Sequence, residues 1–89
     1  MERNKLVKEL ASFFFVYGIL GRELEESAIK EIIENSLDKI ELVETLINKL
    51  TDKVKACNYV EIEQAKAFLL ELERIRIELD FKDFKGNQR

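Results

Sequence analysis

The chain has 89 residues, of which 46% are apolar and 37% charged, and its formal net charge is −3. This length fits one small domain, and the supply of apolar residues excludes intrinsic disorder. Proline is absent and glycine occurs only three times, which favours long helices over turn-rich β-structure.

The first predicted helix spans residues 4–20. Apolar residues recur at helical spacing through this segment, and Gly21 is well suited to the left-handed position that closes many helices. The second predicted helix spans residues 23–35, where an acidic first turn complements the helix dipole. Its apolar stripe is expected to include Ile32.

The third predicted helix spans residues 39–56 and has the clearest start signal in the chain. Asp38 is a candidate N-cap, and Glu41 lies three residues later, as in a capping box. Leu37 and Leu42 have the spacing of a hydrophobic staple. A fourth helix is predicted over residues 60–80, followed by a tail at 86–89.

The third and fourth predicted helices carry two apolar ladders with steps of three and four residues, typical of helices that pack along a narrow seam. The first ladder is Ile40, Val43, Ile47, Leu50, Val54 and Cys57, and the second is Ala65, Phe68, Leu72, Ile75 and Leu79. An antiparallel hairpin that turns near Asn58 accommodates the one-residue slip between the ladders. The alternative is one continuous helix through Asn58, which implies a coiled-coil dimer.

We therefore expect an all-α fold over residues 1–89: a small four-helix bundle that ends in an antiparallel helical hairpin, with a homodimer as an open alternative. The predicted core consists of Leu10, Phe14, Ile32, Val43, Ile47, Leu50, Phe68, Leu72 and Ile75.

The residue types that usually carry chemistry are sparse in this chain. Histidine, the commonest general base and metal ligand, is absent, and the single Cys57 forms neither an internal disulfide nor a cysteine-rich zinc site. Glutamate pairs such as Glu31 and Glu34 lie among lysines at helical spacing, which is typical of a solvated face. We expect a protein that is not an enzyme and that needs no metal or other cofactor.

Residues 10–21 form the longest nearly uncharged run. It is shorter than the roughly 20 residues that a helix needs to span a bilayer. The single unpaired thiol of Cys57 suits a reducing compartment. We expect a cytoplasmic protein that does not contact membranes.

The strongest candidate for a functional surface is residues 13–20, which are apolar on every side of a helix. A segment of this kind lies centrally in a core or contacts another chain, and both alternatives remain open. Aromatic residues are enriched at the centres of protein interfaces. The predicted partner-binding residues are Phe13, Phe15, Val16, Tyr17 and Ile19, supported by Phe81 and Phe84, which either fold back on the first helix or anchor a partner.

Nucleic acid is an unexpected partner for a chain with an acidic net charge, because phosphate contacts dominate the affinity of nucleic-acid-binding proteins. Lys49, Lys53 and Lys55 nevertheless cluster in the sequence and allow a local basic patch. The sequence thus predicts a small protein-interaction module: an adaptor, inhibitor, immunity factor or regulatory subunit. The alternative is an accessory subunit of a nucleoprotein complex that contacts phosphates through these lysines.

Overall fold

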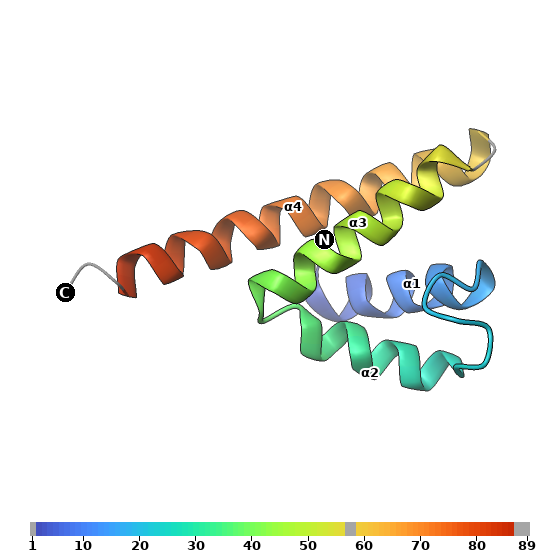
Figure 1. Ribbon diagram of the computed structural model, residues 1–89, viewed down its shortest axis with the longest axis horizontal. Coiled ribbons are helices and arrows are strands. Elements are labelled where there is room, and N and C mark those ends of the chain that lie inside the picture. The colour runs from blue at the N-terminus through green and yellow to red at the C-terminus, as the bar shows by residue number, and fades with distance from the viewer. Residues whose placement is uncertain (1, 57–58, 87–89) are drawn as a thin grey trace.

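A computed structural model of the protein describes the backbone of residues 2–56 and 59–86, and the side chains of residues 2–56 and 61–82. All regular structure in these ranges is helical: α1 spans Arg3–Val16, α2 Glu26–Ser36, α3 Ile40–Lys55 and α4 Tyr59–Gly86 (Figure 1). The prediction of an all-α fold is confirmed.

Successive helices run in alternating directions, so that neighbours in the chain pack antiparallel (Figure 1). The most extensive packing joins α1 to α2 and α3 to α4, and the two pairs lie against each other. The predicted α3–α4 hairpin is therefore confirmed, and the alternative of one continuous helix is wrong. The joint itself, with Cys57 and Asn58, lies outside the described residues. At its other end α4 projects past the beginning of α3 (Figure 1).

One core connects the two helix pairs. Its buried apolar residues are Leu6, Val7, Leu10, Ala11, Phe13, Phe14, Ile29, Ile33, Leu37, Val43, Leu46, Leu50, Ala65, Phe68 and Leu72. Most of the predicted core is among them, and Ile47 and Ile75 pack against it while partly buried. Ile32 is an error of prediction, since it is 41% exposed. Ile29 and Ile33, one turn apart, point inward, and Ile32 lies about 100° away around the helix.

The end of α1 lies four residues earlier than predicted, because Gly18 rather than Gly21 closes the helix. Gly18 has a φ of +60°, a conformation that glycine adopts without steric cost. The Ile19 N–H donates to the Phe14 carbonyl at 3.0 Å, and the Gly18 N–H to the Phe15 carbonyl at 3.3 Å. These two bonds form a Schellman motif.

The predicted capping box at the beginning of α3 does not form. Lys39 occupies the N-cap position, in an extended conformation and without a side-chain cap. The Asp38 carboxylate lies instead 3.2 Å from the Arg3 guanidinium, which also donates to the Glu34 carbonyl. Arg3 thus ties the beginning of α1 to the α2–α3 connection. The predicted staple is also absent, since Leu42 is 39% exposed.

The bounds of α2 and α4 also differ from the prediction: α2 is shorter than predicted and α4 is longer. α2 begins at Glu26, three residues late, so only one of the acidic residues lies in its first turn. α4 extends to Gly86, six residues past the predicted end, because neither glycine nor proline interrupts it earlier. Of the predicted tail, residues 87–89 lie outside the described residues.

Candidate docking surface

The long helix α4 carries apolar residues on two opposite sides. Its inner side buries Ala65, Phe68 and Leu72 completely in the core. On its outer side Leu70 is 74% exposed, while Ile77 and Phe81 are each 59% exposed. We call Ala67, Leu70, Ile77 and Phe81, all exposed, the outer stripe. Leu70 is the most exposed large apolar side chain within the described residues, and no other helix there exposes three large apolar side chains.

The outer stripe has the spacing of a helix-packing seam. With Arg74 included, the positions 67, 70, 74, 77 and 81 step by three and four residues. This is the repeat of a coiled-coil seam, in which alternate steps keep one face of a helix against its partner. Over 14 residues at about 1.5 Å per residue, the stripe extends for about 21 Å.

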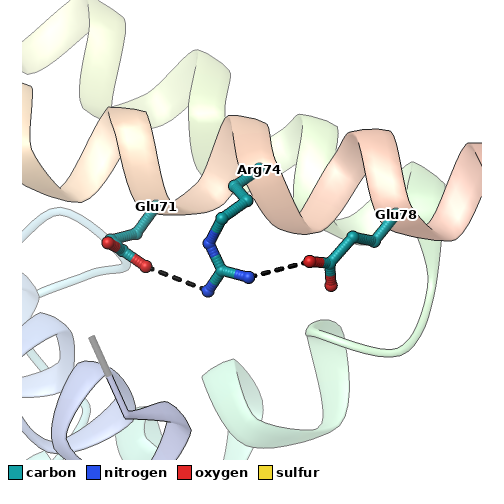
Figure 2. A network of polar contacts seen from close by, with 3 residues as sticks. All are labelled: Glu71, Arg74 and Glu78. Atoms are coloured by element: carbon teal, nitrogen blue, oxygen red, sulfur yellow. Dashed lines mark hydrogen bonds and ion pairs between the residues drawn. The ribbon is translucent and has the colours of Figure 1, made fainter.

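Arg74 interrupts the outer stripe with a fixed charge. Its Nη1 donates to Glu78 Oε1 at 2.9 Å and its Nη2 to Glu71 Oε2 at 3.1 Å. Figure 2 shows the guanidinium between the two carboxylates, one turn of helix away on either side. The hydrogen bond from Arg74 lowers the pKa of the Glu71 carboxyl, and the same bond raises the pKa of Arg74. The triad places two acidic residues along one border of the stripe.

Acidic residues also follow the other border of the outer stripe. Glu73 accepts from Arg76 at 2.9 Å, in a pair that lies toward α3. Asp80, two turns further on, is exposed. Both borders therefore carry carboxylates, and α4 lies in an acidic part of the chain: residues 61–82 hold six acidic and four basic side chains.

The structure divides the predicted partner-binding segment of α1 between the core and the surface. Phe13 is only 3% exposed, so it does not belong to a docking surface. Its ring centroid lies 4.7 Å from that of Tyr17 and 5.5 Å from that of Phe68 on α4. Lys53 of α3 lies over the half-buried Tyr17 ring, with Nζ 4.6 Å from the centroid. This aromatic cluster joins α1 to the hairpin.

The remaining members of that segment form a small apolar patch at the end of α1. Phe15 is 46% exposed and Val16 is 61% exposed, while Ile19 is half-buried. The patch lies beside the end of α3, where Ile19 and Ala56 line one hollow, whereas Leu79 and Lys82, close to Phe81 in the chain, line another at the beginning of α3. The two predicted candidates are therefore separate surfaces. Phe81 is 59% exposed, and the side chain of Phe84 lies outside the described residues.

The three lysines of the nucleic-acid alternative do not share one face. Lys49 and Lys53 lie one turn apart on α3 and line a cavity of about 330 Å³ together with Asp52. Lys55 lies roughly on the opposite side of the helix, because two residues correspond to about 200°. Lys53 is in addition engaged with the Tyr17 ring. The lysines therefore form no continuous basic patch.

No metal site is found among residues 2–56 and 61–82: no three acidic or cysteine side chains gather there in a metal-binding arrangement. A surface hollow of about 530 Å³ lies between the beginning of α3 and α4, lined by Asp38, Lys39, Ile40, Glu41, Leu79 and Lys82. In the part of the chain that the structure describes, no helix is both long and apolar enough to cross a membrane.

Leu70 and Ile77 are the surface residues that the sequence interpretation missed. Both fall outside the ladder that predicts the buried face of the hairpin. The signal was present as a second set of apolar residues with the same repeat, starting at Ala67. A one-sided amphipathic helix has a single set, so two interleaved sets indicate a helix with two contact faces.

Comparisons with protein-family models, with curated proteins and with solved structures find no match to this chain. A proposal about its function therefore depends on the chemistry of its own surface.

Proposed function

We propose that this chain is a small protein-docking module, an adaptor, inhibitor, immunity factor or regulatory subunit without catalytic activity, and that it binds its partner through the outer stripe of α4. The observation that supports this proposal is the exposure of Leu70, Ile77 and Phe81 in register along one helix face. Contiguous exposed apolar surface that is bordered by polar residues is characteristic of protein interaction sites.

The outer stripe contributes apolar surface to such a contact. Burying a large apolar side chain contributes about 1.5–3 kcal/mol. Three such side chains offset part of the association cost of about 4–15 kcal/mol, and the side chains of the partner supply the rest. The outer stripe is also favourably placed, because α4 is held by its inner face and presents the outer face as a rigid helix.

The patch of Phe15 and Val16 is a second possible contact site for the same function. It covers a single helix turn and continues into the polar residues Lys8 and Ser12 on the same side of α1. Its small extent fits a contact at the edge of an interface better than the centre of one.

The test is capture of partners from lysate of the source cells by the tagged full chain, with and without nuclease. Four variants are compared with the wild type: Leu70→Glu and Ile77→Glu on the outer stripe, Val16→Glu on α1, and Ile32→Glu as a matched control. Ile32 is an exposed isoleucine on α2, far from α4 in the contact pattern. Thermal unfolding of each variant verifies that the fold is intact.

We expect a partner that persists after nuclease treatment and is lost with Leu70→Glu and Ile77→Glu, with at least a tenfold reduction in affinity because a charge enters the apolar contact. Ile32→Glu retains it. If only Val16→Glu loses the partner, the docking site is at the end of α1 rather than on α4. Partners that disappear on nuclease treatment refute the proposal and favour the nucleoprotein alternative.

A further inference from the structure

The shape of the outer stripe indicates the kind of partner that it binds. The stripe is a narrow line of apolar side chains on one helix, with a coiled-coil repeat. The four surface cavities described between the helices are lined by residues other than Ala67, Leu70, Ile77 and Phe81. A linear seam of this kind fits a second helix, laid along α4, better than it fits a small molecule or a bulky loop.

A second copy of this chain is a poor occupant of the stripe, because like charges would meet. An antiparallel pairing that places Leu70 opposite Phe81 also places Glu71 opposite Glu78 and Glu73 opposite Asp80. In a parallel pairing the Arg74 side chains of the two copies face each other in the seam. Like charges at these positions oppose pairing, since the residues that border a coiled-coil seam determine the choice of partner.

Glu71 and Glu78 share Arg74, and Glu73 pairs with Arg76. With Asp80 these carboxylates still outnumber the two arginines, so the face remains acidic and is complementary to a basic helix. Glu71 and Glu78 follow one border of the stripe, and Glu73 and Asp80 follow the other. Lysine or arginine residues that border the apolar seam of a partner helix would lie opposite these four carboxylates. Such exposed pairs contribute modestly to affinity, but they select among partners and accelerate association at low salt.

We infer that the outer stripe of α4 binds an amphipathic helix of a partner protein whose apolar seam is bordered by lysine or arginine residues. This inference rests on the proposed docking function and specifies the chemistry of the partner. It concerns the border charges, so it can fail while the docking function holds.

The experiment uses two synthetic peptides, each about four heptads long, with leucine at both seam positions. One peptide has lysine at the positions that border the seam, and the other has glutamate there. Binding to the full-length protein is measured by fluorescence anisotropy at low salt and at about 0.5 M salt, where screening is strong. The protein variants are Leu70→Glu, Asp80→Lys and the control Ile32→Glu.

We expect the lysine peptide to bind at least about tenfold more tightly than the glutamate peptide at low salt, and this preference to shrink at high salt. Leu70→Glu abolishes binding, Asp80→Lys reduces the preference, and Ile32→Glu changes neither. Circular dichroism should show that the lysine peptide gains helix on binding.

Two outcomes overturn the inference and separate it from the docking function. Equal binding of both peptides, lost with Leu70→Glu, shows that the face docks helices without selecting by charge. Absence of binding by either peptide rejects a basic helix as the partner. In that case the docking function stands if partner capture still depends on Leu70, and it falls as well if capture does not.

Discussion

The two faces of α4 carry the same types of apolar residue but differ in their exposure to solvent. Phe68 and Leu72 on the inner face are at most 1% exposed, whereas Leu70 and Phe81 on the outer face are more than half exposed. Both faces repeat every three and four residues. The difference lies in what surrounds them: α1 and α3 cover the inner face, whereas Leu70, Ile77 and Phe81 on the outer face remain more than half exposed.

This contrast shows that apolar periodicity identifies a contact face without identifying its partner. The inner seam is covered by other helices of the same chain. The outer seam has the same repeat, but it is interrupted by Arg74 and bordered by carboxylates. A face that is buried within the chain needs neither a central arginine nor bordering carboxylates. A face that remains in water before it binds a partner benefits from these charges, since they limit unwanted association.

The largest expected effect comes from comparing one leucine on each face. Leu72→Ala should reduce the free energy of unfolding by about 2–5 kcal/mol, because it leaves a cavity in a fully buried site. Leu70→Ala, two residues away on the same helix and 74% exposed, should change it by no more than about 0.5 kcal/mol. Urea unfolding followed by circular dichroism measures both.

A milder variant keeps the comparison valid if Leu72→Ala does not fold, since a domain of this size is only marginally stable. Leu72→Val removes one methylene group and should cost about 1 kcal/mol. Equal losses at Leu70 and Leu72 would contradict the assignment of inner and outer faces.

The inner face was predictable from the sequence because its residues obey one repeat that two helices share. Val43 and Leu50 of α3 and Phe68 and Leu72 of α4 all belong to the predicted ladders and are all buried. The antiparallel hairpin follows from those ladders together with their slip near Asn58. Helix periodicity is a strong signal when both partners lie in the same chain.

Other features depend on a choice between residues that are equally suited to the same role, and the sequence pattern does not resolve this choice. Gly18 and Gly21 are both suited to end α1, and the first one closed it with a Schellman motif. Asp38 has the correct spacing for an N-cap, but a residue 35 positions earlier, Arg3, binds its carboxylate. The segment from Phe13 to Val16 is apolar on all sides, and only packing decides that Phe13 is buried and Phe15 is exposed.

A second prediction concerns Arg74, the charged residue that interrupts the outer stripe and has no counterpart on the inner face. Arg74→Leu makes the outer stripe continuously apolar from Ala67 to Phe81, so it should resemble the inner seam. At about 0.5 M salt, which screens the border carboxylates, we expect self-association at least about tenfold stronger than in the wild type, because each copy then contributes another buried leucine and Arg74 no longer lies in the seam. Light scattering after size-exclusion chromatography measures the mass as a function of concentration.

Arg74→Gln is the control for this variant, because it removes the charge without adding apolar surface. It should associate less than Arg74→Leu. If Arg74→Leu shows no stronger self-association than the wild type at any concentration, the outer stripe is not a helix-packing seam. The proposed similarity between the two faces of α4 is then wrong.

The smallest expected effect concerns the ion pair that borders the outer stripe. Arg74 holds the pKa of Glu71 below its ordinary value of 4.5. The unfolded chain therefore takes up a proton at a higher pH than the folded chain does, so the stabilisation is complete above about pH 4.5 and is lost as the pH falls through the lower, folded-state pKa. Relative to the wild type, Glu71→Gln should be less stable at pH 7, by at most about a quarter of the loss expected for Leu72→Ala.

Urea unfolding of the wild type and Glu71→Gln at several pH values between 7 and 3 measures how this difference changes. It should narrow as the pH falls, because both proteins then carry a neutral side chain at position 71. In an Arg74→Met background Glu71→Gln should have a smaller effect than in the wild-type background, since the double-mutant cycle removes the arginine from the groups that act on Glu71. A difference that stays constant down to pH 3 would mean that Glu71 stabilises the helix through its packing rather than through its charge.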